Sequence, residues 1–189
     1  MAIKKIVILG PESTGKSTLS AQLADHYNSS WVPEYARTYL QHTSNDYAYE
    51  DLWEIAQGQQ LTIDNAVKNF WLMHPGGVSS AGKVYPLFID TDLNVIKIWS
   101  EISFNKCDNR ILTRIAAAKD DLYLLCNTDL PWEPDPLREY PDLAMRQKVY
   151  AYYKDVMVNQ QVRWIDISGN YAERFEKAVS AVDELINIP

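Results

Sequence analysis

Residues 6–18 read IVILGPESTGKST. The first four residues, Ile6 to Leu9, form a continuous apolar run typical of a strand that is buried on both faces of a parallel sheet. The next eight residues fit the pattern G-x-x-x-x-G-K-[ST], and Leu19 and Leu23 begin the apolar stripe of a helix directly behind them. A strand, a glycine-bearing turn and a helix in this order indicate an α/β protein that binds phosphate in the turn.

The turn at residues 10–18 supplies the donors that nucleotide phosphates need. Its glycines let backbone N–H groups approach the ligand, and the helix N-terminus adds its positive dipole. Lys16 would reach the β- and γ-phosphates of ATP, and Ser17 would ligate Mg²⁺. The predicted ATP-binding residues of this turn are Gly10, Pro11, Glu12, Ser13, Thr14, Gly15, Lys16, Ser17 and Thr18.

Outward from this turn, short apolar runs alternate with longer helix-like stretches. Further strands are expected at residues 87–89, 122–125 and 164–167, with a weaker one at 31–32. Residues 48–73 have the pattern of a helix. The clearest helix is the last one, where apolar residues recur at helical spacing from Phe175 to Ile186 and Asn170 is placed to cap its start. This alternation is typical of βαβ units and a parallel sheet.

The composition indicates a single cytoplasmic domain. The chain has 189 residues, of which 47% are hydrophobic, enough for one α/β core. The net charge of −7 excludes non-specific binding to nucleic acid or to an anionic membrane surface. Cys107 and Cys126 suggest reduced thiols, and we expect neither a signal peptide nor a membrane-spanning segment. The aromatic residues are numerous enough that some could form the interface of a homodimer.

Two segments are expected to be irregular. Residues 74–80 read HPGGVSS and indicate a turn-rich surface loop. Residues 129–142 contain four prolines and cannot form a regular helix throughout. A long polar loop in this place predicts a lid over the active site, at about residues 129–146 of a single domain that spans residues 1–189.

Three carboxylates follow expected strands, where open α/β sheets bind their ligands. Glu34 follows the strand at 31–32, and Asp90 and Asp92 follow the strand at 87–89. A carboxylate can accept the proton of an attacking hydroxyl, and Asp90 is also the candidate for the magnesium side. The alternative for Glu34 is a favourable charge at a helix N-terminus, and the alternative for Asp90 is a cap for the next helix.

Arginines that close over a transferring phosphoryl group would stabilise its charge. Arg138 lies in the proline-rich segment, with Arg146 a little beyond it, and Arg37 lies one helical turn after Glu34. Each arginine could instead be a solvated surface residue. Gln59 could face the acceptor or lie on a solvated helix face.

Four tryptophans could stack on a flat base or belong to the core or rim; they are Trp53, Trp71, Trp99 and Trp132. The three histidines have no ligand-like spacing, so Mg²⁺ is the single metal expected.

Six motifs resemble, in order along nearly the whole chain, the ribosylnicotinamide kinase domain of the NadR-like P-loop proteins. They are GPESTGKST (10–18), WVPEYAR (31–37), IAQGQ (55–59), FIDTD (88–92), DLYLL (121–125) and PWEPDPLR (131–138). The first motif alone is generic, and the later ones make the resemblance specific. Because few residues precede the first strand, we expect the standalone form of this domain, without the adenylyltransferase domain of fused members.

The resemblance implies a P-loop NTPase fold, a three-layer α/β/α arrangement with a five-stranded parallel sheet and a lid. It implies phosphorylation of nicotinamide riboside by ATP to nicotinamide mononucleotide, a salvage step toward NAD. The implied catalytic residues are Lys16, Glu34, Asp90 and Arg138, and Arg138 would also contact ATP. The implied acceptor-binding residues are Glu34, Arg37, Gln59, Asp90 and Asp92, and the metal ligands are Ser17 and Asp90.

The sequence departs from the family where the acceptor base would stack. Family members place aromatic residues at two positions that match Pro33 and Asn65 here. Stacking is therefore expected from another residue, such as Trp31, or the acceptor is different. The lid also has Pro136 where glycine is common, which would stiffen it.

Two alternatives to a nicotinamide riboside kinase stay open at this point. A regulatory ATPase or switch protein would use the same phosphate loop, although the sequence lacks the Asn-Lys-x-Asp motif of a GTPase. A kinase could also act on another nucleoside, a nucleotide or a vitamin alcohol.

Overall fold

The protein is described by a computed structural model, which places residues 2–43, 46–74, 84–118 and 120–187. In chain order its elements are β1 (Ala2–Leu9), α1 (Lys16–His26), β2 (Ser30–Val32), α2 (Tyr35–His42), α3 (Asp51–Met73), β3 (Val84–Asp90), α4 (Leu93–Phe104), α5 (Asn109–Ala117), β4 (Leu122–Cys126), α6 (Leu143–Asn159), β5 (Trp164–Ile167) and α7 (Tyr171–Ile186). The turn-rich loop expected at 74–80 lies, apart from His74, outside the described residues.

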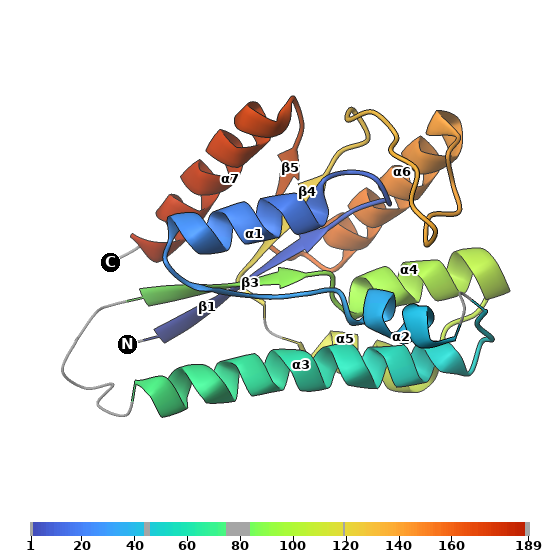
Figure 1. The fold of residues 1–189 in the computed structure, drawn as a ribbon, viewed down its shortest axis with the longest axis horizontal. Coiled ribbons are helices and arrows are strands. Elements are labelled where there is room, and N and C mark those ends of the chain that lie inside the picture. Colours follow the sequence, from blue (N-terminus) through green and yellow to red (C-terminus); the bar gives the residue numbers. More distant parts are fainter. Residues whose placement is uncertain (1, 44–45, 75–83, 119, 188–189) are drawn as a thin grey trace.

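The five strands form one parallel sheet in the order β2-β3-β1-β4-β5 (Figure 1). β1 occupies the centre, where Ile6 pairs with Phe88 of β3 and with Leu122 of β4. Each strand expected from the sequence is present, and the predicted five-stranded parallel sheet is confirmed. Because the strands are parallel, their carboxyl ends meet at one edge, where the loops that follow them gather.

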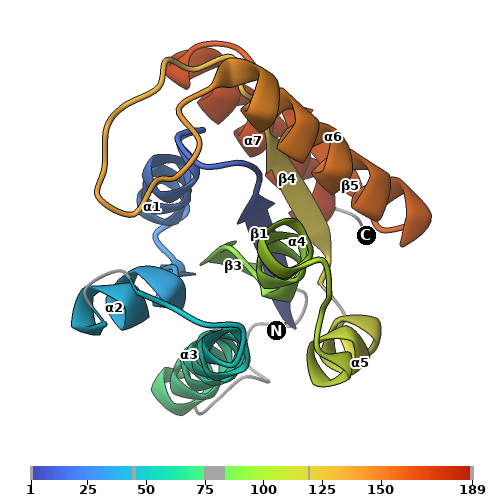
Figure 2. The same cartoon turned by 90° about the vertical axis from the view of Figure 1, so that its right-hand side faces the viewer.

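Alternation along β1 divides the core into two layers. Ile6 and Ile8 face one side of the sheet and pack with residues of α1 and α7. Val7 and Leu9 face the other side and pack with residues of α3, α4 and α6. Figure 2 shows the sheet between α1 on one side and α4 on the other. The continuous apolar run of the sequence is thus a strand buried on both faces, and the three-layer α/β/α prediction is confirmed.

The proline-rich segment expected to be irregular contains neither helix nor strand from residue 127 to residue 142. α6 begins directly after it, and the Asp142 side chain accepts a hydrogen bond from the N–H of Met145 at 2.7 Å. Residues 143–146, which the sequence assigned to the lid, therefore belong to the first turn of α6.

Across the described part of the chain, no helix combines the length and the apolar character needed to cross a membrane. The thiols of Cys107 and Cys126 are both free.

The last helix begins as the sequence predicts. The Asn170 side chain accepts hydrogen bonds from the N–H groups of Ala172 and Glu173, at 3.0 and 3.1 Å. The Glu173 carboxylate in turn accepts from the N–H of Asn170 at 2.8 Å, which completes a capping box. α7 covers one face of the sheet, so this cap supports the layer that also contains α1.

We predict that Asn170→Ala lowers the free energy of unfolding by about 1 kcal/mol, because two N–H groups of the helix lose their acceptor. Urea unfolding followed by circular dichroism measures the change. Asn170→Asp, which keeps an acceptor oxygen, should lie within a few tenths of a kcal/mol of the wild type. Equal losses in both variants would mean that the cap does not stabilise α7.

Candidate active site

The loop between β1 and α1, residues 10–15, packs against the end of β4. Gly10 has a φ of 139° and Gly15 a φ of 77°, values that favour glycine. A Cβ atom on Gly10 would lie 2.6 Å from the carbonyl oxygen of Cys126. Because a side chain cannot fit in that space, glycine is required for the loop to approach β4 this closely.

The N-terminus of α1 is open to an anionic ligand. Its N-cap, Gly15, has no side chain to accept a hydrogen bond, and the first turn, all of it described, contains no acidic residue. The first N–H groups of a helix have no acceptor within the helix, and they lie at the positive end of its dipole. A phosphate group would satisfy both the hydrogen bonds and the charge.

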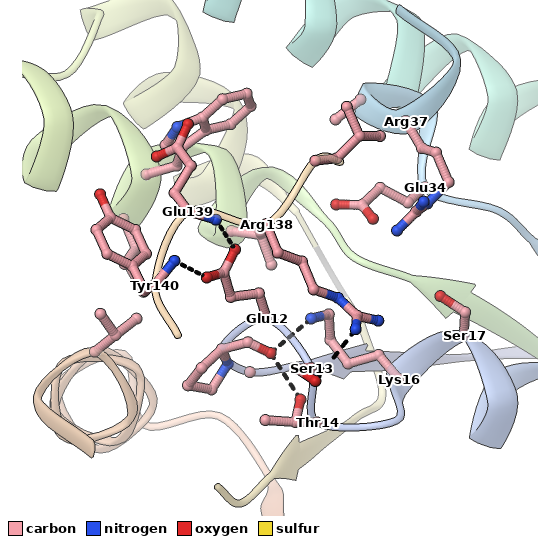
Figure 3. A pocket seen from close by; sticks show the side chains of 18 of the residues that line it. Glu12, Ser13, Thr14, Lys16, Ser17, Glu34, Arg37, Arg138, Glu139 and Tyr140 are labelled. Carbon is pink, nitrogen blue, oxygen red and sulfur yellow. Dashed lines mark hydrogen bonds between the residues drawn. The ribbon is translucent and has the colours of Figure 1, made fainter. Parts of the chain in front are cut away.

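Lys16 points from this helix end back over the loop (Figure 3). Its ammonium group donates to the carbonyl oxygen of Pro11 at 2.8 Å, and the hydroxyl of Thr14 donates to the same oxygen at 2.7 Å. A phosphate oxygen would bind the ammonium group more strongly than a neutral carbonyl does, because its hydrogen bond would be between opposite charges. Lys16 is therefore placed to move onto a bound phosphate.

A buried arginine of α7 fixes the loop from behind. Arg174 is 3% exposed, and its guanidinium donates to the carbonyl oxygens of Gly169, Thr14 and Asn127 at 2.7, 2.9 and 2.8 Å. It also forms an ion pair with Asp129. These bonds join the phosphate loop to the segments that follow β4 and β5.

The sequence analysis did not identify Arg174. The signal that could have revealed it is its position on the buried stripe of α7, one turn before Ala178 and in line with Val182 and Leu185. A charged residue on an otherwise apolar stripe indicates a buried polar contact, because an unpaired charge there would be costly.

The proline-rich segment lies over the loop and is bound to it by two side chains (Figure 3). The hydroxyl of Ser13 accepts from the N–H of Glu133 at 2.9 Å and from Arg138 at 3.3 Å. The carboxylate of Glu12 accepts from the N–H groups of Glu139 and Tyr140.

Burial raises the pKa of the Glu12 carboxyl, and these two N–H groups oppose that shift. Arg138, the arginine predicted to contact phosphate, lies beside the loop because it bonds to Ser13.

A cavity borders the phosphate loop. Glu34 lies opposite the loop, at the junction of β2 and α2, and lines this cavity (Figure 3). Gln59 of α3 supports this junction: its amide oxygen accepts from the N–H of Tyr35 at 2.7 Å. Gln59 is 1% exposed, so it neither lies on a solvated helix face nor lines the cavity. Gly58 permits this contact, because a Cβ atom there would lie 2.0 Å from the Tyr35 ring. Gln59 therefore holds the backbone on either side of Glu34.

Arg37, one turn further along α2, lines the same cavity and pairs with Asp135 of the proline-rich segment at 3.0 Å. This pair links α2 to the proline-rich segment, residues 127–142, which forms the cover of the cavity. Its arginine is 41% exposed at the side chain, so the pair itself contributes little to stability.

Asp90, the last residue of β3, is buried beside the loop. Its Oδ1 atom has no hydrogen-bond partner among the described residues, and the residue is 1% exposed. Burial, and secondly the negative charge of Glu34, raise the pKa of the Asp90 carboxyl to about 6. The ammonium group of Lys16 and a hydrogen bond from Ser17 act in the opposite direction.

Mg²⁺ fits these groups, because it takes oxygen ligands and an unpartnered carboxylate oxygen lies near the hydroxyl of Ser17. The part of the chain that the structure describes contains no cluster of three or more His, Cys, Asp or Glu residues that could hold a metal ion. Such an ion would therefore need oxygens from phosphate and water in addition to the protein.

Asp92 has a different place from the one expected. Both of its carboxylate oxygens accept hydrogen bonds from Asn94, at 2.9 and 2.7 Å, and it caps α4. Burial, and then the charge of Asp120, raise the pKa of its carboxyl to about 7. Asp92 does not line the cavity, so its expected role in acceptor binding is not supported. The helix cap that the sequence offered as the alternative for Asp90 is formed by Asp92.

The cavity continues away from the loop into an apolar compartment between α2, α4 and α6. Its walls are Ala36, Leu40, Val95, Ile98, Trp99, Ile102, Tyr140, Val149 and Tyr153. Trp99 donates from its indole nitrogen to the hydroxyl of Tyr47 at 2.8 Å, which in turn donates to Glu139 at 3.0 Å. Trp31, the expected stacking residue, is not part of this wall. A flat ring would instead meet Trp99 and Tyr140, which the sequence did not single out together.

The structure brings most predicted site residues to one cavity. Those that line it are Gly10, Pro11, Glu12, Ser13, Thr14, Gly15, Lys16, Ser17, Thr18, Glu34, Arg37 and Arg138. Asp90 lies behind this wall, while Gln59 and Asp92 support neighbouring elements. A phosphate loop, a carboxylate and two arginines therefore face one space, with an apolar compartment alongside.

Comparison with known proteins agrees with this geometry. The profile of the AAA_28 family, described as an AAA domain, matches residues 5–174. The "Trifunctional NAD biosynthesis/regulator protein NadR" of Escherichia coli (strain K12) is 28% identical, and the match covers 97% of this chain and 43% of the relative. The protein of the same name from Salmonella typhimurium (strain LT2) gives the same identity and coverage. The chain thus spans less than half the length of these curated relatives.

Solved structures share the fold. A crystal structure of a NadR protein in complex with NR aligns with a TM-score of 0.76 at 22% identity, over 98% of this chain and 50% of that one. A second, in complex with NAD and AMP-PNP, gives 0.74 at 21% identity, with the same coverage. Thymidylate kinase from Ehrlichia chaffeensis gives 0.68 at 11% identity, over 96% of this chain and 100% of the kinase. The chain therefore has a P-loop fold that occurs in kinases.

We predict that Arg174→Met lowers the free energy of unfolding by about 3 kcal/mol, because three buried carbonyl oxygens and Asp129 lose their donor. Arg174→Lys should recover part of the loss, since an ammonium group can reach fewer of these acceptors. Thermal and urea unfolding measure both variants.

The matched control is Lys177→Met on the same helix, an exposed cation bound to Ser168, which should change stability by less than about 0.5 kcal/mol. A loss in Arg174→Met no larger than in this control would contradict the structural role of Arg174.

Proposed function

This chain belongs to the AAA_28 family of AAA domains, and from that premise we propose that it is a kinase that transfers the γ-phosphate of ATP to nicotinamide riboside. The product would be nicotinamide mononucleotide, a precursor of NAD. The proposal treats residues 1–189 as one P-loop kinase domain and residues 129–142 as its lid. The free thiols of Cys107 and Cys126 suit a reducing cytoplasm.

The observation that carries this proposal is one cavity with two unlike halves. One half is the phosphate loop with Lys16, and the other is an apolar compartment lined by residues of α2, α4 and α6. A switch protein needs a nucleotide site alone, whereas a kinase needs room for an acceptor beside the γ-phosphate. The second half therefore favours a kinase over a regulatory ATPase.

The names of similar proteins support the proposed kinase function. The curated relatives are named for NAD biosynthesis, and two structural neighbours contain NR or NAD with AMP-PNP. A third neighbour, thymidylate kinase, is named as a kinase. We transfer from these proteins the use of ATP and a nucleoside as substrates.

In the proposed reaction the acceptor 5′-hydroxyl oxygen forms a bond to the γ-phosphorus as the bond to the β,γ-bridging oxygen breaks. The hydroxyl proton passes to the Glu34 carboxylate and then to water, and ADP leaves. Lys16 and the loop amides hold the β- and γ-phosphates, and Arg138 neutralises charge on the moving group. Arg37 lies beside Glu34 and orients the acceptor.

Ser17 would hold Mg²⁺ directly, and Asp90 would hold it through water. When bound, this ion neutralises charge on the phosphate oxygens. This placement suits the Oδ1 atom of Asp90, which has no hydrogen-bond donor among the described residues.

The acceptor base would stack in the apolar compartment. Pro33 and Asn65 leave no aromatic residue at the two positions where family members keep one. Trp99 and Tyr140 supply rings in the cavity wall instead. A kinase for another nucleoside or a vitamin alcohol is the second candidate. Trp99 and Tyr140 lie on other elements than the two family positions, so they could favour a different base.

The test is an assay of purified protein with MgATP and, separately, nicotinamide riboside, the common nucleosides and thiamine. We expect ADP and the 5′-phosphate in equal amounts with nicotinamide riboside. Equal turnover without an acceptor would instead support a regulatory ATPase. Turnover with another acceptor alone would keep the kinase and replace its substrate.

Lys16→Ala should lower kcat by about 1000-fold, because the transferring phosphoryl group loses its ammonium contact. The measurement is ADP formation at saturating acceptor. Lys68→Ala removes an exposed lysine of α3 and should retain wild-type kcat. Comparable rates in the two variants would remove Lys16 from the mechanism.

Glu34→Gln should lower kcat by about 100-fold while the Kd for MgATP changes less than about threefold, because an amide cannot accept the hydroxyl proton. Isothermal titration and steady-state kinetics separate the two effects. Glu54→Gln, an exposed carboxylate of α3, serves as the matched control. Wild-type kcat in Glu34→Gln would exclude Glu34 as the base.

A further inference from the structure

Arg146 on α6 is a buried cation that forms no ion pair with the residues that the structure describes. The residue is 4% exposed, and its Nε and Nη1 atoms have no hydrogen-bond partner within the described residues. The centroid of the Trp132 ring lies 5.5 Å from its guanidinium carbon. Arg174, which is equally buried, donates to three carbonyl oxygens and one carboxylate. The two arginines therefore differ in pairing and not in burial.

An unpaired buried guanidinium is energetically unfavourable. Arginine stays charged at every physiological pH, so it cannot relieve the burial by losing a proton. Taking such an ion out of water is unfavourable, and contact with an aromatic ring offsets only part of that loss. If Arg146 served the fold alone, an apolar residue of similar length would stabilise the protein better.

The position of Arg146 identifies the kind of partner it lacks. Arg146, Val149 and Tyr153 are spaced three and seven residues apart and share one face of α6, and the last two line the cavity. The Trp132 ring is approached by Arg146 and also by Arg138, whose guanidinium carbon is 5.8 Å from its centroid.

The neighbours of Trp132 lead directly to the phosphate loop. Arg138 and the N–H of Glu133 both donate to the hydroxyl of Ser13. The Arg146 guanidinium thus contacts the same indole ring as Arg138, which itself bonds to the phosphate loop.

We propose that Arg146 is a second phosphate-contacting arginine, which binds a phosphate group of the nucleotide once the segment carrying Trp132 shifts. The proposal rests on the proposed function, since it requires a phosphorylated ligand in this cavity. Arg138 contacts the loop from the proline-rich segment, whereas Arg146 would approach the phosphate from α6, a helix packed on one face of the sheet. Its unfavourable burial in the free protein is offset when the ligand arrives.

The decisive variant is Arg146→Met, because the two explanations predict opposite changes in stability. If Arg146 binds phosphate, removing its unpaired charge leaves the melting temperature of the free protein unchanged or raises it. The same variant weakens MgATP binding by about 10- to 100-fold, since a charge-assisted hydrogen bond is lost. Differential scanning fluorimetry and isothermal titration give the two readouts.

The matched control is Lys148→Met, which removes an exposed cation from the same helix and changes the net charge equally. It should alter neither readout. Arg146→Lys keeps the charge with fewer donors, so its MgATP affinity should lie between those of the wild type and Arg146→Met. Arg146→Lys also supplies the same comparison if Arg146→Met does not fold.

The source of the phosphate is resolved by titrating MgATP, MgADP, AMP and nicotinamide mononucleotide into each protein. A loss confined to MgATP assigns Arg146 to the γ-phosphate, and a loss shared with MgADP assigns it to the β-phosphate. A loss confined to nicotinamide mononucleotide assigns it to the phosphorylated product. Each of these results supports a phosphate contact.

The inference is overturned if Arg146→Met lowers the melting temperature of the free protein and leaves all four affinities unchanged, since Arg146 would then serve the fold alone. Failure of the proposed function is distinguishable, because the wild type would bind MgATP without transferring phosphate, or would not bind it. In the latter case pyrophosphate is the probe. Wild-type binding of pyrophosphate that Arg146→Met retains, or no binding by the wild type, overturns the inference.

Discussion

The hydrogen bonds of the Arg174 guanidinium hold the phosphate loop in place. They reach the carbonyl oxygens of Thr14 in the loop, Asn127 after β4 and Gly169 after β5. One side chain thereby fixes three segments that follow three different strands, and Gly10 lets the loop close onto β4. The direction of Lys16 follows from this constraint, and so do the contacts of Glu12 and Ser13 with the cover of the cavity.

The fold was predictable because its signals are local. Residues 6–9 predict a strand buried on both faces, and the glycines at 10 and 15 predict the turn that follows. Asn170 and Glu173 satisfy each other within one helical turn, so the start of α7 can be found without knowledge of any distant residue. The phosphate half of the cavity follows from the same short stretch of sequence.

The residues that support the site were harder to predict because they meet their partners across long separations in the chain. Gln59 reaches Tyr35 from another helix, and Arg174 reaches Thr14 across 160 positions. The sequence offered Gln59 as an acceptor-binding or solvated residue and did not identify Arg174, and the buried partners of each give it a different role. Asp90 and Asp92 are two residues apart. Asp90 has an oxygen without a partner in the described part of the chain, whereas Asp92 caps α4. Spacing alone does not distinguish them.

A crystal structure with Mg²⁺, AMP-PNP and nicotinamide riboside tests the central claim most directly. The account predicts β- and γ-phosphate oxygens on the backbone amides of residues 13–17, with the Lys16 ammonium moved from the Pro11 carbonyl to phosphate. It also predicts the acceptor 5′-hydroxyl within hydrogen-bond distance of Glu34. A triphosphate bound elsewhere, or loop amides that point away from it, would contradict the account.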